Sequence, residues 1–182
     1  MKSAFLHGVI LICFSSSILA QVCNEKQIQQ TISVKNFTLT EVTNADATAT
    51  DVITGLTWNR CVYGQKWNTT TKQCIGSPVL LTWSEALLEA EKADDFAGWR
   101  LPNIKELNSI LDLQCVNPPY DLEIFPDTFA SEDRGLWTSS PHVDNSSIQT
   151  RTNAWYIDLG QGKLDYRDAA DSTTRNFARF VK

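Results

Sequence analysis

Histidine is scarce in this 182-residue chain, which contains two. His7 belongs to the first twenty residues, so His142 is the one that remains downstream of them. That count leaves little for a histidine-based metal site, and a Ser-His-Asp triad would have to use His142 within a polar loop. No phosphate-binding glycine loop occurs, because Gly160-Gln161-Gly162 lacks the third glycine and the following helix of a dinucleotide site. We therefore expect a binding protein and no enzyme, although a distant pair of carboxylates for glycoside hydrolysis stays open.

Long apolar runs are also absent after residue 20. The first twenty residues start with a base, Lys2, and carry an apolar run from Val9 to Phe14. Ser17 and Ala20 are small residues at positions −4 and −1 of a cleavage after residue 20. This layout is typical of a secretory signal peptide and is too short for a membrane span. We expect an exported, soluble protein in the periplasm, outside the cell or on its surface.

Net positive charge is lacking as well. The chain has 16 basic and 21 acidic residues. Removal of residues 1–20 also removes Lys2, which leaves fifteen bases and a net charge of −6. Such a charge disfavours nucleic acid and other polyanions as partners. The remaining 162 residues suit a single domain with its own core.

Four cysteines follow the first twenty residues, and an even number in an exported chain predicts two disulfides. Three pairings are open from the sequence alone, and we favour Cys61–Cys74 and Cys23–Cys115. The first would close a polar, turn-rich loop, with a stabilisation of roughly 3 kcal/mol. The second would tie down the N-terminal arm. Zinc is disfavoured because no CxxC spacing occurs and a single histidine is left, so we expect no metal or other cofactor.

Two segments carry the signature of a capped helix. Residues 82–93 start with Thr82 and Glu85 in a T-x-x-E capping box, in which each side chain accepts the other's free backbone N–H. Asn103 and Glu106 repeat the device as N-x-x-E at the start of a second helix. In both segments apolar residues recur at helical spacing, so each helix has one face for the core.

The other segments favour short strands and loops. We predict strands at 54–62 and 136–140, a hairpin over 154–167, a last strand at 176–182 and an irregular ordered loop from 114 to 135. Residues 21–45 form an N-terminal arm with at most one strand. This order predicts an α+β fold, with two helices packed on short antiparallel sheets, long ordered loops and two disulfides.

The motifs TGLTWNRC, GQKW, TWSEAL, GWRLPNIKEL, LWTSS, AWYIDLGQGK and ARFVK follow one another in this chain. Their order over about residues 46–182 resembles the Lcl C-terminal domain family, named after the last domain of the Legionella collagen-like adhesin. GWRLPNIKEL also resembles the wider C-type-lectin-like fold, including its formylglycine-generating-enzyme branch. In that fold the first and last strands pair, which implies that Leu56–Arg60 lies beside Phe177–Val181. The segment after the second helix then faces the ligand.

The resemblance implies surface attachment or carbohydrate binding. This chain has no collagen-like repeat, and its acidic charge fits a neutral sugar or a surface protein better than a sulfated glycan. The alternatives are a structural subunit of an envelope assembly without a small ligand, or a hydrolase or oxidase of the formylglycine-generating-enzyme type. The oligomeric state is open, homo-oligomers included.

Arg100 and Trp67 are the residues whose roles are hardest to assign. Arg100 follows Trp99, which we expect to be a structural residue of the core, and precedes a Leu-Pro. A guanidinium there needs acceptors, so we expect Arg100 to be a structural strut held by Glu106 or by backbone carbonyls. The alternative for Arg100 is ligand contact. Trp67 lies inside the proposed Cys61–Cys74 loop, where no apolar period explains it. It is either an exposed platform for stacking a sugar or a cap on the core beneath its loop.

A polar cluster that follows the predicted hairpin supplies the other candidate ligand-binding residues. With the preceding loop, these are Arg151, Asn153, Asp165, Tyr166, Arg167 and Asp168. Asp165, Asp168 and Asp171 also suggest calcium, but the EF-hand pattern is absent, so a calcium site is the disfavoured alternative.

Overall fold

The computed structural model of the chain describes residues 21–42, 46–92, 98–127, 135–143 and 153–182. The helices are α1 (Trp83–Glu91), α2 (Ile104–Ser109) and the short 3-10 helix η1 (Val34–Asn36). The strands are β1 (Val22–Cys23), β2 (Phe37–Val42), β3 (Asp46–Asp51), β4 (Thr57–Asn59), β5 (Lys66–Asn68), β6 (Gln73–Ile75), β7 (Cys115–Val116), β8 (Gly135–His142), β9 (Asn153–Asp158) and β10 (Lys163–Asp168). Helices and short antiparallel sheets together confirm the α+β class.

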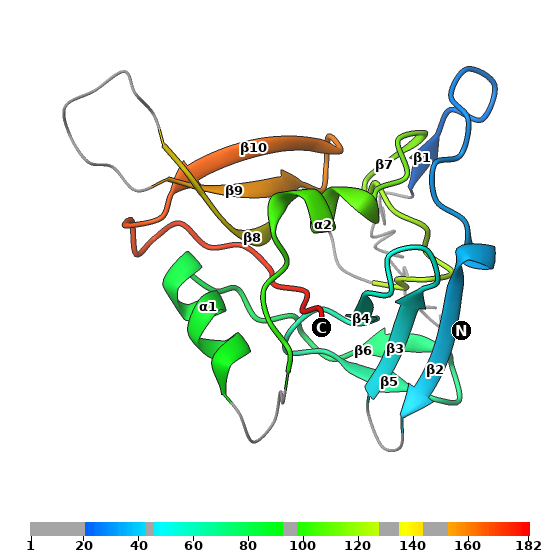
Figure 1. Cartoon of the computed structure of the whole chain (residues 1–182), viewed down its shortest axis with the longest axis horizontal. Helices are drawn as coiled ribbons and strands as arrows, with labels where there is room; N and C mark the ends of the chain where they lie inside the picture. Colours follow the sequence, from blue (N-terminus) through cyan, green and yellow to red (C-terminus); the bar gives the residue numbers. More distant parts are fainter. Residues whose placement is uncertain (1–20, 43–45, 93–97, 128–134, 144–152) are drawn as a thin grey trace, which may run out of the picture.

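Two three-stranded sheets, β2-β3-β4 and β10-β9-β8, frame the molecule, and the C-terminal segment runs between them (Figure 1). Val181 bridges to Trp58 of β4, while Phe177 bridges to Leu136 of β8. The expected pairing of the first and last strands is therefore confirmed. The prediction of a regular last strand is wrong, because residues 176–182 change partner every few residues and make isolated bridges only.

The N-terminal arm contains two strands, β1 and β2, so the prediction of at most one strand is wrong. Strand pairing and a disulfide join the arm to the domain. β2 pairs with β3 along its whole length, from Phe37 opposite Asp51 to Val42 opposite Asp46. β1 pairs with β7, and the Cys23–Cys115 disulfide lies in that pair. The second disulfide joins Cys61 to Cys74, so both favoured pairings are confirmed.

Both helices begin where their capping residues predict. The Thr82 side chain accepts the backbone N–H of Glu85, and the Glu85 carboxylate accepts the N–H of Thr82. Asn103 and Glu106 make the same reciprocal pair at the start of α2. Each box satisfies two backbone donors that a helix terminus leaves free.

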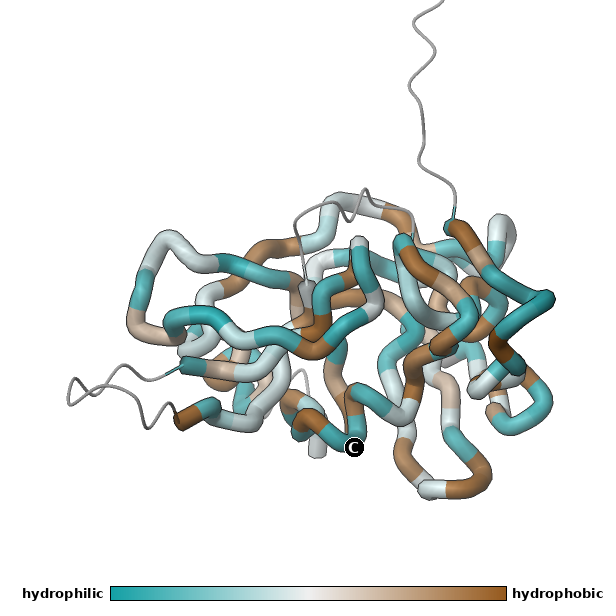
Figure 2. Tube along the Cα trace, turned by 90° about the horizontal axis from the view of Figure 1, so that it is seen from above, coloured by the Kyte–Doolittle hydropathy of each residue, from teal (hydrophilic) through white to brown (hydrophobic). Residues whose placement is uncertain are grey.

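The core contains two large clusters, to both of which β8 and β9 contribute, and a small third cluster around Trp67. Leu136 and Ile157 belong to the cluster that contains Leu107 and Ile110 near the end of α2. Trp137 and Tyr156, which alternate with them along the strands, pack with Ala86 and Ala90 of α1. Figure 2 accordingly shows apolar and polar residues interspersed along most of the chain, with no single long apolar run.

A fully buried arginine, Arg179, lies inside the C-terminal segment. It forms an ion pair with Asp127, whose side chain is 2 % exposed. The Nη2 atom faces Asp127, and the Nη1 atom donates to the carbonyl oxygens of Asn59 at 2.8 Å and Arg60 at 2.5 Å. The Tyr120 hydroxyl donates to the same carboxylate at 2.6 Å. Burial raises the pKa of Tyr120 well above its ordinary value, which keeps this phenol protonated as a donor.

Candidate functional site

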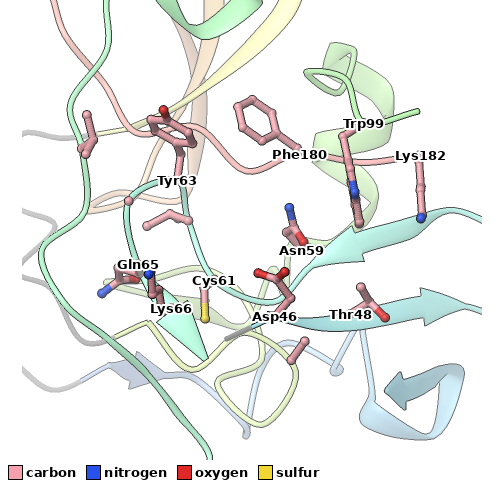
Figure 3. Close-up of a pocket in the computed structure, with 14 residues that line it drawn as sticks. Asp46, Thr48, Asn59, Cys61, Tyr63, Gln65, Lys66, Trp99, Phe180 and Lys182 are labelled. Atoms are coloured by element: carbon pink, nitrogen blue, oxygen red, sulfur yellow. The ribbon is translucent and has the colours of Figure 1, made fainter. Parts of the chain in front are cut away.

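A pocket of about 630 Å³ opens where β3 and β4 meet the loop that leads into β5 (Figure 3). We call it the Trp99 pocket. Three aromatic rings line it, from Tyr63, Trp99 and Phe180. Its polar lining comes from Asp46, Thr48, Asn59, Gln65, Lys66 and Lys182. Aromatic rings and convergent polar groups in one hollow are typical of small-ligand sites.

The floor of the pocket is the outer side of the β3–β4 pair. Thr48 lies directly opposite Asn59 in the register of the two strands. Strand alternation places their neighbours Ala47 and Trp58 on the other side, where both are buried. In Figure 3, Asp46 and Asn59 project from these strands toward the space below the aromatic rings.

The aromatic side of the pocket is fixed by contacts outside it. The Tyr63 hydroxyl donates to Glu89 of α1 at 2.6 Å and points away from the hollow, so the ring is what Tyr63 offers there (Figure 3). The Phe180 ring packs edge-on against Tyr63 with centroids 5.8 Å apart. The Lys182 ammonium lies 4.7 Å from the centre of the Trp99 ring, a cation–π contact at the rim.

Arg100 holds the corner that carries Trp99. Its guanidinium donates to both carboxylate oxygens of Glu106, at 2.7 and 2.8 Å, and its backbone pairs with Val181. The Arg100 guanidinium lowers the pKa of Glu106, while burial opposes that shift. Glu106 is thus the partner of the Arg100 guanidinium, as expected. Arg100 fixes the chain between the Trp99 ring and the start of α2.

The third wall, residues 61–66, is stapled by the Cys61–Cys74 disulfide. Gly64 has φ +94°, and a Cβ there would lie 2.5 Å from Cγ2 of Val79. Only glycine fits this close approach in a left-handed conformation. Lys66 follows as the first residue of β5 and is exposed.

Trp67 is buried, with 4 % of its surface exposed. Of the two alternatives for Trp67, the cap on the core beneath its loop is therefore confirmed, and the exposed stacking platform is wrong. The stapled loop forms the hairpin β5–β6, and Trp67 faces Cys74 across it. Its ring packs under the Arg60 guanidinium, which lies 4.1 Å from the ring centre, and in a small cluster with Ala47. Lys66 therefore points outward and Trp67 points inward. A strand of three residues is too short for this alternation to be recognised in the sequence.

The other predicted ligand-binding residues, apart from Arg151, lie on β9 and β10, across the molecule from β5 (Figure 1). Tyr166 faces Trp155 across the strands, and His142 stacks on Tyr166 with centroids 4.0 Å apart. Trp155 is half-buried beside this pair. Arg167 lies over the Tyr156 ring at 4.5 Å. We call this set the β10 surface.

The remaining predicted residues do not converge on one site. Asn153 is buried at the start of β9, and Arg151 lies outside the described residues. Asp165 and Asp168 accept nearby backbone N–H groups. Asp171 binds Thr173 and Thr174, and the Thr173 hydroxyl lowers its pKa. In the described part of the chain no three His, Cys, Asp or Glu side chains come together as a metal site.

A family model described as the Lcl C-terminal domain matches residues 47–182. The chain belongs to the Lcl C-terminal domain family. No curated protein and no solved structure matches it. None of the helices described in this Lcl C-terminal domain is long and apolar enough to cross a membrane.

Sequence reasoning missed the Trp99 pocket, although its residues lie in the motifs that carry the family resemblance. Asn59 comes from TGLTWNRC, Lys66 from GQKW, Trp99 from GWRLPNIKEL, and Phe180 and Lys182 from ARFVK. Four motifs that are spread over 120 residues of sequence thus meet at one hollow of the Lcl C-terminal domain. The order of the motifs along the chain does not show that several of them surround a single pocket.

Proposed function

We propose that this Lcl C-terminal domain is an exported, surface-acting binding domain that holds a carbohydrate in the Trp99 pocket. The observation that carries the proposal is the meeting of four family motifs around one pocket of mixed aromatic and polar lining. Two disulfides fit an exported protein. We also propose a C-type-lectin-like architecture, but carbohydrate binding in the Trp99 pocket does not depend on it.

The lining matches the chemistry of a sugar. Pyranose C–H faces pack on aromatic rings, and Trp99 and Tyr63 supply such rings at the pocket. Sugar hydroxyls need donors and acceptors together, which the Asn59 amide provides from the floor. Lys66 and Lys182 add two positive charges to the lining and Asp46 adds one negative charge. The net negative charge of the whole chain favours a neutral sugar over a sulfated one.

The same lining supports binding without catalysis. Asp46 is the single carboxylate among the described lining residues. Retaining and inverting glycosidases in general need two carboxyl groups that flank the scissile bond. We therefore propose that the bound sugar is released chemically unchanged and that its binding uses no cofactor.

The test is a glycan array with the oxidised protein, residues 21–182, with and without calcium. Lys66→Ala and Asn59→Ala should weaken binding to any sugar that the wild type retains, by about 3- to 10-fold per lost contact of roughly 0.5–1.5 kcal/mol. Lys105→Ala and Asn108→Ala are the matched controls, because both side chains are exposed on α2 away from the pocket. Equal losses in pocket and control variants would contradict the proposal.

The β10 surface is the competing site for the same ligand. Tyr166→Ala and Arg167→Ala test it, together with the loop variant Arg151→Ala. Loss of binding in these variants, with Lys66→Ala unaffected, would move the ligand to β10. Wild-type protein that binds no glycan in either condition would instead favour a protein partner.

A further inference from the structure

The sheet β2-β3-β4 has one covered edge and one uncovered edge. On the β4 side, Thr57 and Lys182 exchange two backbone hydrogen bonds, at 2.8 and 2.9 Å. On the other side β2 is the last strand among the described residues, and it lies at the outside of the molecule (Figure 1). The open edge of β2 therefore offers backbone donors and acceptors to another strand.

The register shows which backbone groups point outward. The Val52 N–H donates to the Asn36 carbonyl at 2.9 Å, so even-numbered residues of β2 bond to β3 and odd-numbered ones face the edge. The Phe37 N–H is used, because it donates to the Val34 carbonyl. The N–H and C=O groups of Leu39 and Glu41 have no partner within the described part of the chain.

β2 also lacks the usual protection of an edge strand. β10, the outer strand of the other sheet, carries Lys163, Asp165, Arg167 and Asp168, and charges of this kind discourage pairing. β2 has the sequence FTLTEV with a single charge. The Glu41 carboxylate already binds Lys72 at 2.6 Å, and that ammonium lowers the pKa of Glu41.

We propose that β2 pairs antiparallel with β2 of a second copy of this chain, with Leu39 opposite Glu41 and Thr40 opposite Thr40. The two-fold axis then passes through the Thr40 pair. The free N–H and C=O groups of Leu39 and Glu41 in one copy form hydrogen bonds with those of the other copy. Thr40 is exposed, and a threonine pair directly across two strands is favourable. No charge faces a like charge, since each Glu41 lies opposite a leucine.

The pairing has a geometric consequence for binding. A two-fold axis through an antiparallel strand pair stands perpendicular to the sheet, so corresponding faces of the two copies point the same way. The outer side of β3–β4 is the floor of the Trp99 pocket. Both pockets of the dimer would therefore face one target surface, where two linked sites raise the effective affinity. The pairing is a separate claim and stands whether or not the pocket binds sugar.

Sedimentation equilibrium of the oxidised protein over a wide concentration range tests the pairing. The contact is small, so we expect a weak association in which the mass rises from one copy toward two. Thr40→Lys and Thr40→Glu each place like charges opposite one another and should weaken association by about fivefold. An equimolar mixture of the two variants places opposite charges there and should restore the dimer. Thr70→Lys is the control, because it adds the same charge on the exposed β5–β6 turn.

Amide hydrogen exchange of the wild type gives a second test that needs no variant. The N–H groups of Leu39 and Glu41 should exchange more slowly at high protein concentration than at low concentration. A wild type that stays monomeric throughout would overturn the proposal. So would Thr40→Lys protein that is folded by circular dichroism and associates as the wild type does.

Discussion

Removal of the Arg179 charge should destabilise the domain strongly. Arg179→Met takes away the cation that faces Asp127 and keeps much of the side-chain volume. Asp127 has a 2 % exposed side chain and would lose its cationic partner, while the Tyr120 hydroxyl would still donate to it. Burial already raises the pKa of Asp127, with Arg179 opposing that shift, so the carboxylate depends on this partner.

The magnitude follows from the burial of both groups. Breaking a buried ion pair by removing one partner costs about 3–5 kcal/mol, because a charge is left uncompensated. The carbonyl oxygens of Asn59 and Arg60 lose their donor in the same variant, which places the loss near the upper end of that range. An apolar replacement of both partners removes the charge problem. The double variant Asp127→Leu/Arg179→Met should therefore be more stable than Arg179→Met.

The assay is urea unfolding of the oxidised protein, followed by tryptophan fluorescence. Arg179→Met should lower the free energy of unfolding by about 3–5 kcal/mol, and the double variant should recover most of that loss. A change below about 1 kcal/mol for Arg179→Met, or a double variant less stable than either single one, would refute the reasoning.

Three further predictions concern local features. The Arg100 guanidinium lowers the pKa of Glu106 below its ordinary 4.5, so the stability from this pair is present above pH 4.5 and is lost as pH falls through the lowered pKa; acid unfolding of Glu106→Gln should show a weaker pH dependence. A Cβ on Gly135 would lie 2.2 Å from the Tyr156 ring, so Gly135→Ala should lower the melting temperature markedly or abolish folding. Replacing both cysteines of the Cys61–Cys74 disulfide by serine should cost roughly 3 kcal/mol in urea unfolding.

Local signals made part of this fold predictable. The capping boxes of Thr82 and Asn103 involve residues three positions apart, so the sequence alone shows where both helices begin. Arg100 and Glu106 are only six positions apart, so the sequence could predict this pair for the same reason. The cysteine pairings followed from loop closure and from an arm that needed an anchor.

The Trp99 pocket depends on contacts that no local pattern reveals. Asn59 and Lys182 lie 123 positions apart in the chain and meet because the C-terminal segment pairs with β4. The sequence leaves the two roles of Trp67 open because its burial comes from Arg60 and Ala47, which are brought to it by tertiary packing. Isolated bridges likewise replace a last strand because the neighbours of residues 176–182 lie on several different elements.

The most direct test of the central claim is chemical-shift mapping of labelled protein with a sugar found on the array. Titration should move the side-chain amide of Asn59, the backbone amide of Lys66 and the indole N–H of Trp99 together, with one dissociation constant. Shifts confined to Tyr166, Arg167 and their neighbours on β10 would contradict a carbohydrate site in the Trp99 pocket.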